Sequence, residues 1–129
     1  MSLTISRQQW QLLLGALEDV RRQHHLVTYR SLLERLDLPA PAMRTLALAL
    51  EHLAQQDAAA GRPLRSALVI SQGVSRLPRP GFFECAQRLG CFSGAVDGPA
   101  AASWHAAEVA RVFEYVYPEE PSCCGAGEP

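Results

Sequence analysis

The chain has 129 residues, of which 48% are hydrophobic and 19% are charged, with nine glycines and nine prolines. This balance is typical of a single globular domain and excludes disordered and collagen-like classes. The longest apolar runs fall far short of the roughly 20 residues that a membrane-spanning helix needs. The first residues also lack the basic and apolar regions of a signal peptide. We therefore expect a cytoplasmic protein with no membrane partner.

Charge is distributed unevenly along the chain, although the formal net charge is only −1. Residues 1–92 contain eleven arginines and seven acidic residues, whereas residues 93–129 contain one arginine and six acidic residues. All twelve basic residues are arginine, the side chain that binds phosphate through two parallel hydrogen bonds. The pattern predicts a basic body and an acidic end.

Three helices are predicted in the first half of the chain. After Ser6, a good N-cap, apolar residues recur at three- and four-residue steps and predict a helix over 7–24. The segment LVT follows, and Thr28 is placed to cap a second helix, YRSLLERL. Two prolines in DLPAP interrupt the pattern before a third helix over 42–59, which should end ahead of Gly61.

The pattern changes in the second half of the chain. The apolar run ALVI, residues 67–70, predicts a strand, and SQGVS predicts a turn. The segment RLPRPG can pair only at a sheet edge, because proline donates no hydrogen bond. We therefore expect a two-stranded hairpin over about 66–80, with an exposed basic tip.

Two more helices are predicted after this hairpin. FFECAQRLG should form a short helix that is closed by Gly90, and Ser103 should cap a last helix over about 103–117. The apolar stripe of the last helix is expected to pack against the first helix or against another copy of the chain. Residues 1–117 are thus expected to form one domain, and residues 118–129 a flexible acidic tail.

The cysteines give little support for a metal or a disulfide. Cys85, Cys91, Cys123 and Cys124 match none of the usual spacings of structural zinc sites, and a cytoplasmic chain of this composition does not need disulfides. Nor does the sequence contain a Gly-rich phosphate loop, a Ser-His-Asp spacing or a paired-carboxylate motif. We therefore predict no metal, no cofactor and no enzymatic activity, with Cys85 as a small buried apolar residue.

The order of helix, strand, two helices and hairpin over residues 7–90 resembles a winged helix-turn-helix domain, here with added C-terminal helices. The fold class that follows is mainly α with a small β-hairpin. The segment VTYRSLLERLDLPAPAMRTLALAL resembles the helix-turn-helix itself. This resemblance implies that residues 42–59 form the recognition helix, whose N-terminal residues would enter the major groove of DNA.

A narrower resemblance is to the C-terminal domain of DNA alkyltransferases and alkyltransferase-like proteins, which have a TYG-L opening and a reactive PCHR motif. The corresponding stretch here is RPLRSALVI, in which Leu64 takes the place of the reactive cysteine and Arg65 that of the histidine. The resemblance therefore implies no alkyl transfer. The portion ALVI to RPGFFECA also resembles small uncharacterised bacterial winged-helix proteins.

The candidate contacts to nucleic acid follow from these resemblances. In the recognition helix, polar side chains near the N-terminus are few, and the wing region carries more positive charge. Arginines in the wing would bind phosphates mainly and so supply affinity more than sequence specificity. The candidate residues are Arg30, Arg44, Thr45, Arg62, Arg65, Arg76 and Arg79.

Two functions are compatible with the sequence. The first is binding of double-stranded DNA, in a role related to transcription. The second is protein interaction, as an adaptor or a homodimeric structural module, because the Ala-rich helices could pair with a partner. The salt dependence of binding to generic duplex DNA distinguishes them, because phosphate contacts weaken steeply as salt rises.

Overall fold

A computed structural model describes residues 6–72, 76–96 and 98–117 of the chain, so the predicted tail over 118–129 lies outside the described residues. The fold is mainly helical with one small two-stranded parallel sheet. Its elements in chain order are α1 (Arg7–Arg22), β1 (Val27–Thr28), α2 (Tyr29–Arg35), α3 (Ala42–Ala59), the 3-10 helix η1 (Arg65–Leu68), β2 (Val69–Ile70), α4 (Pro80–Arg88) and α5 (Pro99–Glu114).

Local capping explains why α1 and α2 begin where the sequence predicts them. Ser6 forms a capping box with Gln9 at the start of α1, and the Thr28 hydroxyl accepts a hydrogen bond from the backbone N–H of Ser31 in α2. The predicted bounds of α3 are confirmed, and Gly61 follows its C-cap with a φ of +73°. These helix ends are determined by residues within a few positions of each other.

The hairpin predicted over residues 66–80 is wrong. Instead, β2 pairs in parallel with β1, so that Val69 lies opposite Val27 and Ile70 opposite Thr28. No strand follows β2 within the described residues 71–72 and 76–79, although the N–H of Ser71 donates to the carbonyl of Leu77 at 2.8 Å. Pro78 and Pro80 remove two of the N–H groups that a returning strand would need.

The last helix begins earlier than predicted. Gly98 is its N-cap and Pro99 occupies the first turn, where its missing N–H costs nothing. The prediction that this helix packs against the first helix is confirmed, since Val109 and Val112 belong to the same core as residues of α1. Val116, however, lies beyond the helix and is 83% exposed, so it does not contribute to that packing.

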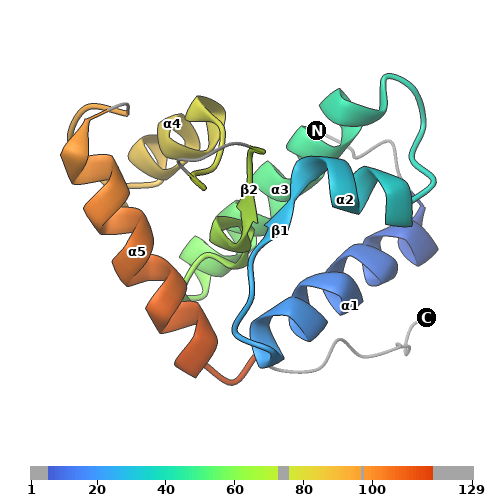
Figure 1. Cartoon of the computed structure of the whole chain (residues 1–129), viewed down its shortest axis with the longest axis horizontal. Coiled ribbons are helices and arrows are strands. Elements are labelled where there is room, and N and C mark those ends of the chain that lie inside the picture. The colour runs from blue at the N-terminus through green and yellow to red at the C-terminus, as the bar shows by residue number, and fades with distance from the viewer. Residues whose placement is uncertain (1–5, 73–75, 97, 118–129) are drawn as a thin grey trace.

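Two apolar clusters fill the interior. The larger one joins α1, α2, α3, α5 and the sheet, and the smaller one joins the end of α3 and Leu64 to α4 and α5 through Phe83, Phe92 and Trp104. In Figure 1 the small sheet lies at the centre of the molecule, with α1 to one side and α5 to the other. In the described part of the chain, no helix combines the length and apolar character needed to cross a membrane.

Candidate functional site

A cavity of about 330 Å³ lies where α3, η1, the start of α2 and the start of α4 meet. One wall comes from α3, where Ala47, Leu50 and Ala54 follow at three- and four-residue steps and therefore share one face. The first turn of α4 supplies the opposite wall, including Pro80 and Phe82. The volume is at the lower end of the range of about 300–1,000 Å³ that is usual for ligand pockets.

Polar side chains also line this mainly apolar cavity, which we call the α3–α4 cavity, and three of them are Ser66, Tyr29 and Cys85. Ser66 is only 3% exposed, and its Oγ has no hydrogen-bond partner among the described residues. The Tyr29 hydroxyl accepts a hydrogen bond from the backbone N–H of Arg79 at 3.2 Å. Burial raises the pKa values of Tyr29 and of the Cys85 thiol, so both groups stay protonated at neutral pH. A protonated, buried thiol is a poor nucleophile.

The backbone around Ser66 is held by three buried side chains that come from α3 and α5. The Glu108 carboxylate accepts a hydrogen bond from the N–H of Leu64 at 2.7 Å, and Asp57 accepts one from the N–H of Arg65 at 3.0 Å. His105 Nε2 lies 2.8 Å from the carbonyl oxygen of Ala67, to which it can donate. We call these three residues the 64–67 brace, because they fix the segment that carries Ser66.

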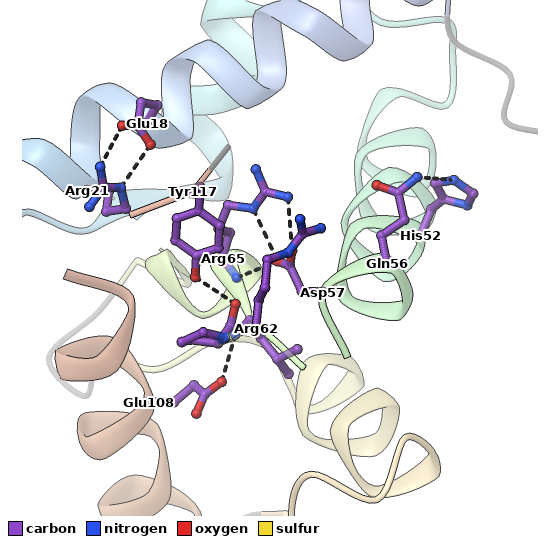
Figure 2. Close-up of polar contacts among 11 residues, drawn as sticks. Glu18, Arg21, His52, Gln56, Asp57, Arg62, Arg65, Glu108 and Tyr117 are labelled. Atoms are coloured by element: carbon purple, nitrogen blue, oxygen red, sulfur yellow. Dashed lines mark hydrogen bonds and ion pairs between the residues drawn. The ribbon is translucent and has the colours of Figure 1, made fainter. Parts of the chain in front are cut away.

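Asp57 is the centre of a buried charge cluster (Figure 2). Its carboxylate lies 3.0 Å from Arg62 Nε and 2.9 Å from the terminal nitrogen of Arg65. The Tyr117 ring covers the Arg65 guanidinium, whose central carbon is 4.6 Å from the ring centroid. The Tyr117 hydroxyl donates to the carbonyl of Pro63 at 2.7 Å, and burial raises its pKa. The cluster thus ties the chain after α3 to the residues that follow α5.

The brace makes stability dependent on pH through His105. Burial lowers the pKa of His105, so the unfolded chain binds a proton more readily than the folded protein does. The stabilisation of the folded protein by neutral His105 is therefore complete above about pH 6.5, the pKa of an unperturbed histidine. This stabilisation is lost as the pH falls toward the lowered pKa of the folded state.

We expect the variant His105→Gln to show a smaller fall in unfolding free energy between neutral and mildly acidic pH, measured by urea denaturation. The matched variant of exposed His25, His25→Gln, should keep the slope of the unchanged protein; an equal effect of both would contradict the role of His105.

Three of the predicted nucleic-acid contacts are engaged inside the protein. Arg65 is buried and Arg62 is largely covered, and both guanidinium groups bind Asp57. Thr45 is also buried, and its hydroxyl donates to the carbonyl of Pro39 at 2.9 Å. Because these groups are used to hold the fold, the geometry does not present them to a ligand.

The other four predicted residues are exposed but do not lie together. Arg30 is paired with Glu34 at 3.6 Å, and both side chains are 71% exposed, so this pair is weak. The exposed residues Arg44 and Arg79 have no carboxylate partner among the described residues. Arg79 lines the α3–α4 cavity, and Arg44 precedes the lining residue Ala47 by one turn of α3.

Arg76 lies elsewhere. It lines a separate open cavity together with His24 and His25, near the end of α1, and with Phe113 of α5. The basic face that the sequence predicted is thus divided into a part beside the α3–α4 cavity and a part beside the end of α1.

No sequence pattern predicted a site role for Ser66, Tyr29 or the three residues of the brace. One signal was present for Asp57, which is followed by Arg62 and Arg65 and lies one turn after the core residue Leu53. No comparable signal marks Ser66, because only the three-dimensional packing shows that its hydroxyl is unpartnered. Within the described ranges, no group of three or more histidine, cysteine or acidic side chains is arranged to hold a metal ion.

Comparison of the chain with protein-family models, with curated proteins and with solved structures gives no match. The function proposed below therefore depends on the residues and geometry of this chain alone.

Proposed function

We propose that the protein binds double-stranded DNA without catalysing a reaction, as a winged helix-turn-helix protein in which α2 and α3 form the helix-turn-helix. In this arrangement α3 is the recognition helix, and the segment between β2 and α4 takes the place of the wing. The observation that carries the proposal is the exposure of Arg44, in the first turn of α3, and of Arg79, at the start of α4, without carboxylate partners among the described residues.

The positions of these two arginines give them different roles. Arg44 lies in the first turn of α3, where a recognition helix contacts base edges in the major groove. Arg79 is the N-cap residue of α4, and its guanidinium lies beside the Tyr29 ring, 6.0 Å from the ring centroid. A guanidinium held in this way is suited to a phosphate of the DNA backbone. Arg30, at the start of α2, and Arg76 would add further phosphate contacts.

Removal of the two arginines tests this proposal. We expect the double variant Arg44→Ala, Arg79→Ala to bind a duplex of about 20 base pairs at least roughly tenfold more weakly at low salt, because two charge-assisted contacts are lost. The slope of log affinity against log salt should become shallower by about 1, because of the two residues only Arg79 contacts a phosphate. Fluorescence anisotropy between about 50 and 200 mM salt measures both quantities.

The single variants distinguish a phosphate contact from a base contact, and a charge-matched control tests whether any lost arginine has the same effect. Arg79→Ala should weaken binding equally for all sequences, whereas Arg44→Ala should alter any preference among sequences. The control Arg22→Ala removes the same charge from α1, where Glu18 already binds Arg22 at 2.9 Å, and should change affinity little. The proposal fails if the intact protein does not bind duplex DNA at about 50 mM salt, or if Arg22→Ala weakens binding as much as the double variant.

The alternative function, an adaptor or a homodimeric module, lacks a comparable observation. A large exposed apolar face that a partner could cover would support such a role. Among the described residues, only Leu12 and Val116 are large hydrophobic side chains with high exposure, and they lie on different elements. We therefore propose DNA binding rather than protein interaction.

A further inference from the structure

The proposed DNA contacts involve exposed arginines and leave the interior of the α3–α4 cavity unoccupied by DNA. Its walls are mainly apolar, with Leu50, Ala54 and Phe82 among the lining residues, and Ser66 contributes a buried hydroxyl. A buried hydroxyl without a partner normally costs stability, because it gives up its hydrogen bonds to water. A ligand that forms a hydrogen bond with Ser66 would explain why this buried hydroxyl has no partner in the protein.

The hydrogen-bonding state of Tyr29 indicates what kind of ligand atom fits. The Tyr29 oxygen already accepts from the N–H of Arg79, and no described residue accepts its hydroxyl hydrogen. The Tyr29 hydroxyl can therefore donate a hydrogen bond to a ligand in the cavity, and the Ser66 hydroxyl can donate one as well. An oxygen atom that accepts hydrogen bonds, such as that of a carbonyl group, is complementary to both hydroxyls.

The charges that line the cavity cancel. Glu51 and Arg79 carry opposite charges and both line the cavity, so the lining has no net charge that would select a cation or an anion over an uncharged ligand. Cys85, whose protonated thiol adds a small and weakly polar surface, contributes no further charge. The apolar walls supply the remaining contacts through burial of the ligand's hydrocarbon part.

From these observations we propose that the α3–α4 cavity binds a small, uncharged carbonyl compound with an apolar body. Its carbonyl oxygen accepts a hydrogen bond from the buried Ser66 hydroxyl, and its body lies against α3 and Phe82. This site goes beyond the proposed binding of DNA, since its ligand is uncharged and is not a polyanion.

Two probes of nearly equal shape test the site in the full-length protein without DNA. Acetophenone has the carbonyl group, and ethylbenzene has a methylene group in its place. In ¹H–¹⁵N NMR titrations, acetophenone should shift the amide signals of residues that line the cavity. It should bind roughly fivefold more tightly than ethylbenzene, the effect of one net hydrogen bond.

Substitutions in the cavity then identify the group that recognises the carbonyl. Ser66→Ala should remove most of the preference for acetophenone without weakening ethylbenzene binding. It should also raise the melting temperature of the free protein, because an unpartnered buried hydroxyl is lost. Ala47→Phe should block both probes by filling the cavity, whereas Ala106→Phe, at an exposed position on α5, should leave both affinities unchanged.

Three results would overturn this inference. The first is that acetophenone shifts no residue of the cavity lining. The second is that ethylbenzene binds the unchanged protein as tightly as acetophenone does. The third is that Ser66→Ala keeps the full preference for the carbonyl. Because all titrations are made without DNA, a failure here leaves the proposed DNA binding untouched, and the reverse also holds.

Discussion

Replacement of Asp57 by alanine is expected to lower the free energy of unfolding by about 3–5 kcal/mol, the usual cost of breaking a buried ion pair from one side. Asp57 is 0% exposed and accepts hydrogen bonds from Arg62 Nε and from the backbone and guanidinium of Arg65. Without the carboxylate, the buried Arg65 guanidinium keeps its charge but loses its partner. The backbone N–H of Arg65 loses its acceptor as well.

Urea denaturation measures this effect, and Asp19→Ala is the matched control. The Asp19 side chain is 64% exposed and lies 3.9 Å from Arg35, so its loss should cost less than about 1 kcal/mol. Because Asp57 is part of the 64–67 brace, any Asp57→Ala protein that still folds should also show altered NMR signals around Ser66. A loss in Asp57→Ala no larger than that in Asp19→Ala would show that the cluster contributes little.

Replacement of Phe83 by alanine should have an effect of similar size, about 3–5 kcal/mol. Phe83 is 2% exposed, and its ring lies 5.3 Å from that of Phe82, 5.8 Å from that of Phe92 and 6.2 Å from that of Trp104, measured between centroids. Its removal leaves a void in the smaller apolar cluster, which joins α4 to α5, and the neighbouring rings cannot fill it without moving.

Thermal denaturation followed by circular dichroism measures the loss, and Leu12→Ala serves as the control. Leu12 is also a large apolar residue on a helix, but it is 51% exposed and should cost less than about 0.5 kcal/mol. Phe82, the residue next to Phe83, lines the α3–α4 cavity, so Phe83→Ala should also weaken acetophenone binding if the variant remains folded. Equal melting temperatures for the two variants would contradict the packing described for α4.

Part of the candidate site could be predicted from the sequence. Arg44 is predicted from its place in the recognition helix and Arg79 from its place in the wing region; both are exposed, and Arg79 lines the cavity. Arg62 and Arg65 carry the same charge and were grouped with them, yet both bind the buried carboxylate of Asp57. An arginine has the same local signature whether it faces solvent or a buried acid, so its role depends on which residue folding brings beside it.

By itself the sequence determined the first three α-helices, because caps and apolar periodicity act over a few residues, whereas the start of α5 and the 3-10 helix η1 were not predicted. Ser6, Thr28 and Gly61 mark helix ends that the fold keeps. Only the tertiary structure decided which strand β2 pairs with. Val69 pairs with Val27 in parallel, a contact between segments far apart in the chain, and no local pattern in residues 66–80 specifies such a partner. The α3–α4 cavity has the same origin, since Tyr29, Ser66 and Phe82 meet only when α2, η1 and α4 pack around α3.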